Sequence, residues 1–208
     1  MAEDGYICLI DDEPTVANAA AALLRQAGYA VRCYSDALAF LADWREDRTL
    51  CVITDLKMPV LSGLELQQRL REMASVVPLV VLSGHADVRT AVRMMEDGAI
   101  SVLEKPYDPV EFLQVVQRAV TRGVQTRSEQ QSTLSIISRF QQLTVEERQA
   151  LDLMLTGLPN KAIALRLDVS MRTVDRRRRT VMSKMGVDSI SELAMLVARL
   201  PQDERAAP

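Results

Sequence analysis

Short β-rich runs alternate with helical patterns along the first part of the chain, and this alternation limits the fold more than any other feature. Between the runs, segments such as Val16–Gln26 and Gly63–Met73 place apolar residues at helical spacing. Strands that alternate with helices predict an α/β domain, in which a parallel sheet is covered on both faces and the crossovers are right-handed. The five runs are Tyr6–Ile10, Ala30–Tyr34, Cys51–Thr54, Leu79–Ser83 and Ile100–Leu103.

The charge of the chain is unevenly distributed, which suggests two domains. Residues 1–123 contain 12 Lys and Arg against 18 Asp and Glu, a net charge of −6, whereas residues 124–208 contain 13 against 10, a net charge of +3. A chain of 208 residues is long enough for two modest domains. An acidic first half and a basic second half predict different partners for them.

Neither a membrane segment nor a disulfide is expected. No run of about 18 apolar residues occurs, and the N-terminus lacks the basic start and the apolar length of a signal peptide. Cys8, Cys33 and Cys51 are odd in number, and each lies in an apolar, strand-like run. We therefore expect a cytoplasmic protein with buried, reduced thiols.

The pattern divides the chain into a first domain of residues 1–123, a polar linker of residues 124–142 and a small helical domain of residues 143–208. The linker is either irregular or a helical continuation of the first domain, and its lapse of apolar period argues against a coiled coil. In the last region, Thr144–Glu147 is a capping-box pattern, and Lys161–Leu167 and Met171–Met185 read as two helices joined by a tight turn. Together they predict a helix–turn–helix.

Acidic residues follow two of the predicted strands. Asp11 and Asp12 follow the first strand, and Asp55 ends the third. Because the carboxyl ends of neighbouring parallel strands lie side by side, we expect these three carboxylates to converge, as an oxygen site for Mg²⁺ would require. Alternatively, Asp11 and Asp12 only cap the helix that begins at Pro14.

Two further side chains are expected at the same edge. The fourth strand ends in Ser83, and the fifth leads to Lys105. A cation, an ammonium and a hydroxyl around Asp55 would form a cradle for a phosphoryl group, with Asp55 as the nucleophile. Alternatively, Lys105 is a surface lysine before a turn. His85, the single histidine, makes no metal site alone, and we expect it in a loop near the phosphoryl group.

The first domain resembles the receiver domain of two-component response regulators. The matching stretches are LIDDEP (9–14), TDLKMPVLSG (54–63), LSGH (82–85) and EKP (104–106). This resemblance implies a flavodoxin-like fold with strand order 2-1-3-4-5 and phosphorylation of one aspartate by a sensor histidine kinase. It also implies that the protein is no enzyme beyond its own phosphoryl transfer and dephosphorylation.

The resemblance also assigns roles to residues. Asp55 would be the phosphoacceptor, and Asp12, Asp55 and the main-chain carbonyl of Lys57 would bind Mg²⁺ or Mn²⁺ directly, with Asp11 acting through water. Ser83 and Lys105 would contact the phosphoryl oxygens, with a cis peptide after Lys105. The chain departs from the family at Val102, where an aromatic switch residue is usual. The switch then runs through Ser83 and its loop, or through Tyr107.

An arginine-rich stretch in the second domain points to nucleic acid. On a helix over residues 171–185, Arg172, Arg176 and Arg179 share one face, opposite a stripe that contains Val174, Val181, Met185 and Arg178. A basic face on the second helix of a helix–turn–helix enters the major groove of DNA. The alternative is an ordinary solvated face.

This region resembles the LuxR-type helix–turn–helix of FixJ/NarL response regulators, through LTVEER, LDLMLTGLPNKAIALRLDVS and RTVDRRRRTVMSKMGV. The resemblance implies base contacts by Asp175, Arg176 and Arg179, with Arg172 on the same DNA-facing surface. It implies phosphate contacts by Asn160, Lys161, Arg177 and Lys184. Asp175 is unusual in such a place, and pairing with Arg172 or Arg179 on its own helix is the alternative.

The sequence thus predicts a transcriptional response regulator that binds promoter DNA as a homodimer when phosphorylated, with RNA polymerase as a further candidate partner. Two alternatives stay open. One is an atypical regulator that binds DNA without phosphorylation, and the other is an adaptor whose C-terminal helices bind a protein.

Overall fold

The chain folds into two compact units, which are described separately. The computed structural model describes residues 5–84 and 88–201. The first unit comprises Met1–Arg127 and the second Ser128–Pro208, so the first runs past the predicted boundary at residue 123. No helix in the described ranges is both long and apolar enough to cross a membrane.

The first unit contains a five-stranded parallel sheet in the order β2-β1-β3-β4-β5, which confirms the expected flavodoxin-like topology. In the central pair, Ile10 of β1 lies opposite Thr54 of β3. The residues that follow, Asp11 and Asp55, are therefore brought to the same edge of the sheet. The strands are β1 (Tyr6–Ile10), β2 (Ala30–Tyr34), β3 (Thr49–Asp55), β4 (Leu79–Ser83) and β5 (Ser101–Glu104).

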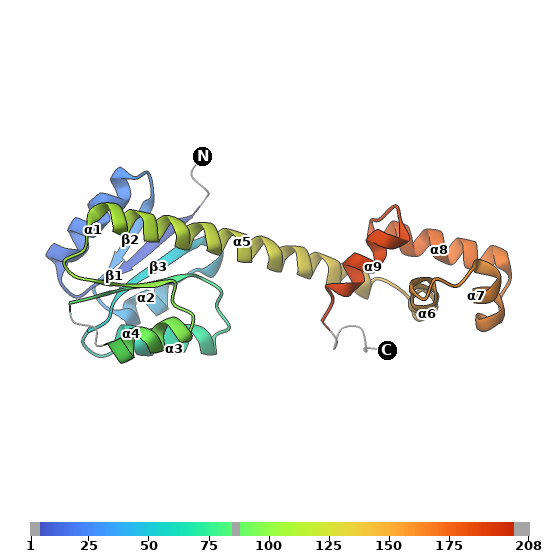
Figure 1. Ribbon diagram of the computed structural model, residues 1–208, viewed down its shortest axis with the longest axis horizontal. Coiled ribbons are helices and arrows are strands. Elements are labelled where there is room, and N and C mark those ends of the chain that lie inside the picture. The colour runs from blue at the N-terminus through green and yellow to red at the C-terminus, as the bar shows by residue number, and fades with distance from the viewer. Residues whose placement is uncertain (1–4, 85–87, 202–208) are drawn as a thin grey trace. The chain divides into compact units, whose positions relative to one another are not determined.

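Helices cover both faces of the sheet (Figure 1). Ile7 and Leu9 of β1 pack into the layer with α1 and α5, whereas Cys8 and Ile10 pack into the layer with α2, α3 and α4. Because both faces are buried, the central strands read as continuous apolar runs. The helices are α1 (Pro14–Gln26), α2 (Ala37–Asp43), α3 (Gly63–Glu72), α4 (Val88–Glu96) and α5 (Pro109–Gln141), with a 3₁₀ helix η1 (Glu46–Arg48) before β3.

One expectation about the cysteines is wrong. Cys8 and Cys51 are buried, but Cys33 is exposed. Cys33 lies on β2, which is an edge strand and is largely exposed. Burial raises the pKa of Cys8 to about 11 and raises that of Cys51 further still, so both thiols stay protonated and act as small apolar side chains.

Helix α5 extends through the residues that were expected to form the linker, as far as Gln141. Its part in the first unit is fixed at two points. Gly123 packs directly against the Pro78 ring and the carbonyl of Leu50. Arg127 donates hydrogen bonds to the carbonyl groups of Asp47, Glu46 and Thr49, at 3.4, 2.9 and 2.6 Å, and so caps the 3₁₀ helix η1.

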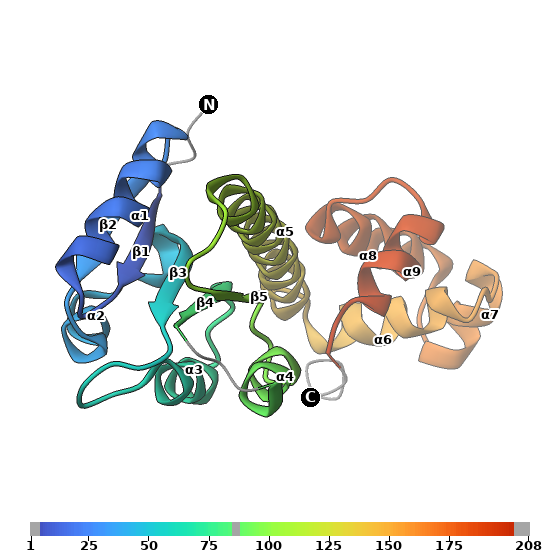
Figure 2. The same cartoon turned by 60° about the vertical axis from the view of Figure 1, so that its left-hand side comes forward.

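The second unit packs four short helices and the end of α5 around one apolar core (Figure 2). The predicted capping box at Thr144 is present, Ser170 caps α8, and Gly186 ends α8 in the left-handed region at φ 66°. Asp168, at φ 52°, forms the tight turn between α7 and α8. The helices are α6 (Val145–Leu155), α7 (Asn160–Leu167), α8 (Met171–Met185) and α9 (Ile190–Ala198).

The close packing of Gly123 gives a testable prediction. Glycine to alanine inside a helix normally stabilises a protein, by roughly 0.5–1 kcal/mol. Here an added Cβ would lie 2.8 Å from two carbons of the Pro78 ring and 3.2 Å from the Leu50 oxygen. We expect Gly123→Ala to lower the free energy of unfolding by about 1–3 kcal/mol, measured by urea denaturation. Thr121→Ala, at an exposed site of the same helix, is the control and should be near neutral.

Candidate functional sites

Three charged side chains meet at the carboxyl edge of the sheet. Asp11 follows β1, Asp55 ends β3 and Lys105 follows β5. The two aspartates are only 3% and 7% exposed. The Lys105 Nζ donates to Asp11 Oδ2 at 2.7 Å and also to Asp55 Oδ1. A single ammonium therefore bridges two buried carboxylates that lie 44 residues apart in the sequence.

Main-chain groups fix the remaining atoms of this cluster. The N–H of Glu13 donates to Asp11 Oδ1 at 2.9 Å, and the N–H of Lys57 donates to Asp55 Oδ2 at 2.6 Å. The N–H of Lys105 donates to the carbonyl of Ser83 at 2.7 Å, and a cis peptide follows Lys105. Asp11 thus accepts from the N–H of Glu13, the residue before α1, and also binds the lysine, whereas no side-chain capping bond is made at the N-cap of α1.

The electrostatics of the cluster favour a further cation. Burial alone would lower the pKa of Lys105, but the hydrogen bonds and charges of Asp11 and Asp55 outweigh it and raise that pKa. The ammonium thus stays charged at neutral pH, and it shares the site with two acidic side chains. Because Mg²⁺ binds through one or two carboxylates and keeps several waters, Asp11 and Asp55 fit its needs.

The expected convergence of three carboxylates is only partly seen. Asp12 is exposed beside the pair, and in the described part of the chain no three acidic, histidine or cysteine side chains group as metal ligands. Ser83 ends β4, next to β3, and is 1% exposed. His85 lies outside the described residues.

Close backbone packing holds Asp55 in place, a feature that the sequence interpretation did not single out. Helix α3 begins at Gly63, capped by Ser62 and Glu65. A Cβ on Gly63 would collide with the main-chain oxygen of Asp55. The N–H of Gly63 donates to the carbonyl of Leu56 at 3.0 Å. Glycine is therefore required where this helix approaches the end of β3.

Val102 and Tyr107 differ in their surroundings. Val102 is partly buried and packs against the layer of α2, α3 and α4. Tyr107 is also partly buried, and its ring stacks on Phe112 with centroids 4.9 Å apart. Burial raises the pKa of Tyr107, so its hydroxyl stays protonated at neutral pH.

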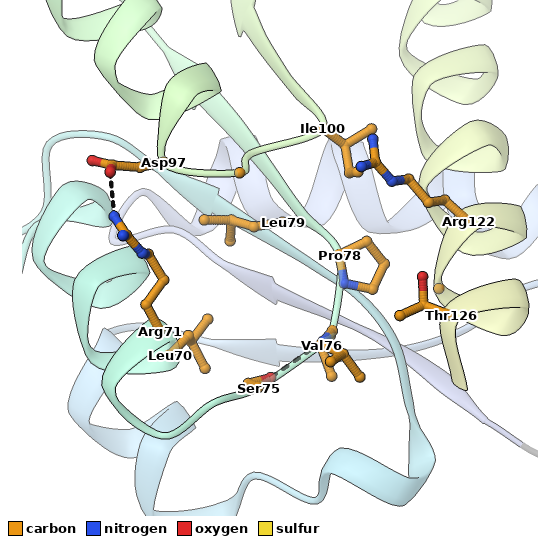
Figure 3. A pocket seen from close by; sticks show the side chains of 13 residues that line it. Leu70, Arg71, Ser75, Val76, Pro78, Leu79, Asp97, Ile100, Arg122 and Thr126 are labelled. Atoms are coloured by element: carbon orange, nitrogen blue, oxygen red, sulfur yellow. Dashed lines mark hydrogen bonds and ion pairs between the residues drawn. The ribbon is translucent and has the colours of Figure 1, made fainter. Parts of the chain in front are cut away.

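A separate pocket of about 250 Å³ opens at the other edge of the sheet, where β4 begins (Figure 3). Its walls include the apolar side chains of Val76, Pro78 and Ile100, and Arg71 pairs with Asp97 at its rim. No lining residue belongs to the Asp11–Asp55–Lys105 cluster. The pocket therefore takes no part in the chemistry of that cluster.

In the second unit, α8 carries a groove of about 500 Å³ with three arginines. Arg172, Arg176 and Arg179 are exposed, whereas Val174 and Val181 on the other side of the helix are buried. The predicted division of α8 into a basic face and a core face is confirmed. The lining residues are Ser170, Arg172, Thr173, Arg176, Arg179 and Thr180.

Several other predicted DNA contacts have partners within the domain. The Asn160 Nδ2 donates to Asp175 Oδ1 at 2.7 Å, so Asp175 pairs with α7 and not with the side chain of Arg172 or Arg179. The Lys184 Nζ donates to Glu147 Oε2 at 2.6 Å and to the carbonyl of Gln142 at 3.0 Å. Lys161 is exposed and Arg177 partly buried.

The bridging ammonium gives a second prediction. Lys105→Met leaves two buried carboxylates without their counter-charge. We expect it to lower the free energy of unfolding by about 3–5 kcal/mol at pH 7 in a chelator. Lys57→Met removes the same charge from an exposed side chain and should change the free energy of unfolding little.

The same interaction predicts an alkaline limit. The pKa of Lys105 is raised in the folded protein, so its stabilisation is complete below the unfolded value of about 10.4 and is lost as the pH rises through the folded value. The difference between wild type and Lys105→Met should therefore shrink above about pH 10.4. An equal difference at all pH values would contradict the assigned ion pairs.

Two family models match the chain. The response regulator receiver domain matches residues 7–117, and the model described as bacterial regulatory proteins, luxR family, matches residues 141–197. The transcriptional regulatory protein FixJ of Rhizobium meliloti is 37% identical over 193 residues, which are 93% of this chain and 95% of FixJ. The response regulator protein TodT of Pseudomonas putida is 35% identical over 194 residues, 93% of this chain and 86% of TodT.

Solved structures agree with these matches. The low-resolution structure of the response regulator StyR superposes with a TM-score of 0.89 at 31% identity, covering 95% of this chain and 100% of StyR. The structure of full-length FixJ from B. japonicum superposes with a TM-score of 0.58 at 34% identity, covering 96% of this chain and 98% of FixJ. The chain therefore belongs to the response regulators in which a receiver domain is joined to a LuxR-type DNA-binding domain.

Proposed function

We propose that Asp55 accepts a phosphoryl group from a sensor histidine kinase and that this modification controls the binding of promoter DNA. The observation that carries the proposal is the bridge from the Lys105 ammonium to the Asp11 and Asp55 carboxylates. It places a fixed positive charge beside an acceptor oxygen at the carboxyl edge of a parallel sheet, where ligands of such folds bind.

The proposed reaction is a phosphoryl transfer. An Asp55 carboxylate oxygen forms a bond to phosphorus while the bond from phosphorus to the kinase histidine breaks. Lys105 neutralises part of the charge on the transferring group, and the Ser83 hydroxyl lies one strand away to bind a phosphoryl oxygen. Positioning of the reacting groups and stabilisation of charge account for most of the rate enhancement in such reactions.

A divalent cation completes the proposed site. Asp11, Asp12, Asp55 and the main-chain carbonyl of Lys57 are the proposed ligands for Mg²⁺ or Mn²⁺. When bound, the cation supplies charge neutralisation between the anionic donor and the anionic acceptor. Asp11 and Asp55 are already held in place by main-chain N–H groups, which leaves little reorganisation for binding.

The response to phosphorylation is proposed to pass through the β4–α4 region and to end in homodimerisation. A valine at position 102 cannot swing a ring between solvent and core. Ser83 and Tyr107 are therefore the proposed switch residues. RNA polymerase is a further proposed partner of the DNA-bound dimer.

The phosphoacceptor is tested by mass. Wild type, incubated with Mg²⁺ and acetyl phosphate, should gain the mass of one phosphoryl group and increase in molar mass by light scattering. Asp55→Asn should do neither, and a chelator should prevent both. Asp47→Asn, an exposed aspartate away from the site, should behave as wild type. Phosphoryl uptake by Asp55→Asn would place the acceptor at another residue. Wild-type DNA affinity that does not change with the phosphodonor would instead favour an atypical regulator that binds DNA without phosphorylation.

DNA binding is tested with the arginines of α8. The double variant Arg176→Ala with Arg179→Ala should weaken the binding of mixed-sequence duplex DNA by more than tenfold, measured by fluorescence anisotropy at several salt concentrations. Arg199→Ala, in the same domain but outside the groove, should keep nearly full affinity. A wild type without salt-sensitive binding would favour the protein-interaction adaptor.

A further inference from the structure

We infer that the groove on α8 selects guanine, through Arg176 and Arg179, and that Asn160 acts as a positioning residue that keeps the Asp175 carboxylate away from the bases. This inference rests on the proposed DNA binding and adds the class of base that the protein reads. It depends on three observations about which polar groups of the groove are already in use.

The first observation concerns the hydroxyl groups of the groove. The Ser170 and Thr173 hydroxyls bond to each other at 2.9 Å, and Ser170 also accepts from the N–H of Thr173. The Thr180 hydroxyl donates to the carbonyl of Arg176 at 3.1 Å. Thr180 and one of the two hydroxyls of the Ser170–Thr173 pair therefore donate within the helix, and the guanidinium groups are the main source of hydrogen-bond donors to a ligand.

The second observation concerns the acid on this helix. Asn160 of α7 stands between Asp175 and Arg178 of α8. Its Nδ2 donates to Asp175 Oδ1 at 2.7 Å, and its Oδ1 accepts from an Arg178 terminal nitrogen at 3.2 Å. The two opposite charges fix both ends of the amide. The Asp175 carboxylate is thereby tied to α7, and Asp175 does not line the groove.

The third observation concerns the two central arginines. The Arg179 Nε donates to the carbonyl of Asp175 at 3.3 Å, so this guanidinium would meet a base with its two terminal nitrogens. Within the described ranges, the Arg176 guanidinium takes part in no hydrogen bond or ion pair. Both groups can therefore make two parallel hydrogen bonds.

Chemistry then selects the base. A guanidinium has only donors. Guanine presents two acceptors, O6 and N7, in the major groove, whereas adenine and cytosine each present an amino donor, and thymine presents one acceptor and a methyl group. A carboxylate in the groove would accept from cytosine instead. Because Asp175 is bonded to Asn160, the guanidinium groups are the main donors that face a base, and guanine is the one base that can accept two hydrogen bonds from a guanidinium.

The experiment selects duplexes from a library with randomised central positions, using the full-length protein with Mg²⁺ and acetyl phosphate. The bound duplexes should share two guanines, and 7-deazaguanine, which lacks the N7 acceptor, should weaken binding about tenfold at either one. Arg176→Ala and Arg179→Ala should each lose the preference at one of the two positions. Arg199→Ala, with the same change in charge, should keep both.

Variants of the amide network test the positioning role. Asp175→Asn keeps an acceptor oxygen for Asn160, so the variant should keep the preference for guanine. If Asp175 instead read cytosine in the wild type, the variant would prefer adenine at that position, and this result would overturn the inference. Asn160→Ala releases the carboxylate, so the guanine preference should fall by several-fold while the domain still unfolds cooperatively. An unchanged preference in Asn160→Ala would also overturn the positioning role.

The outcomes separate the two proposals. Salt-sensitive binding of duplexes without enriched guanine, or indifference to 7-deazaguanine, overturns the inference and leaves the proposed DNA binding intact. If no duplex is bound in any state of the receiver, both fail.

Discussion

The ion bridge between the Lys105 ammonium and two buried carboxylates is the interaction on which the first domain depends. Asp11 and Asp55 are both buried, and the ammonium of Lys105 is the partner that their carboxyl groups share. The sheet order makes the bridge geometrically available, because β1 and β3 are neighbours and β5 lies two strands from β3. The fold thus brings two acidic side chains and one lysine that are far apart in the sequence together at one edge of the sheet.

Much of this arrangement could be predicted from the sequence, because it depends on local rules. Strand ends, helix caps and the basic face of α8 follow from hydrophobic period and from residues such as Ser170 and Gly186, whose roles are set by their own backbone. The edge on which Asp11, Asp55 and Lys105 meet follows from parallel topology alone.

The rest depended on tertiary contacts that no local pattern encodes. Cys33 sits in an apolar run like the other cysteines, but its strand is at the sheet edge. The alternative partner expected for Asp175 was an arginine on its own helix, yet its side chain pairs with Asn160, one helix earlier. Asp12 is exposed whereas its neighbour Asp11 is buried. The sequence pattern could not predict this difference, because both acids follow the same strand.

The anchoring of α5 has a consequence for dissecting the protein. An isolated receiver ending at residue 123, where the polar composition begins, would keep Gly123 against Pro78 but lose the Arg127 guanidinium and its three bonds to the carbonyls around η1. Those carbonyls would then turn to solvent at the start of β3, the strand that ends in Asp55. A fragment whose end is chosen from composition alone would therefore lose hydrogen bonds at the start of β3.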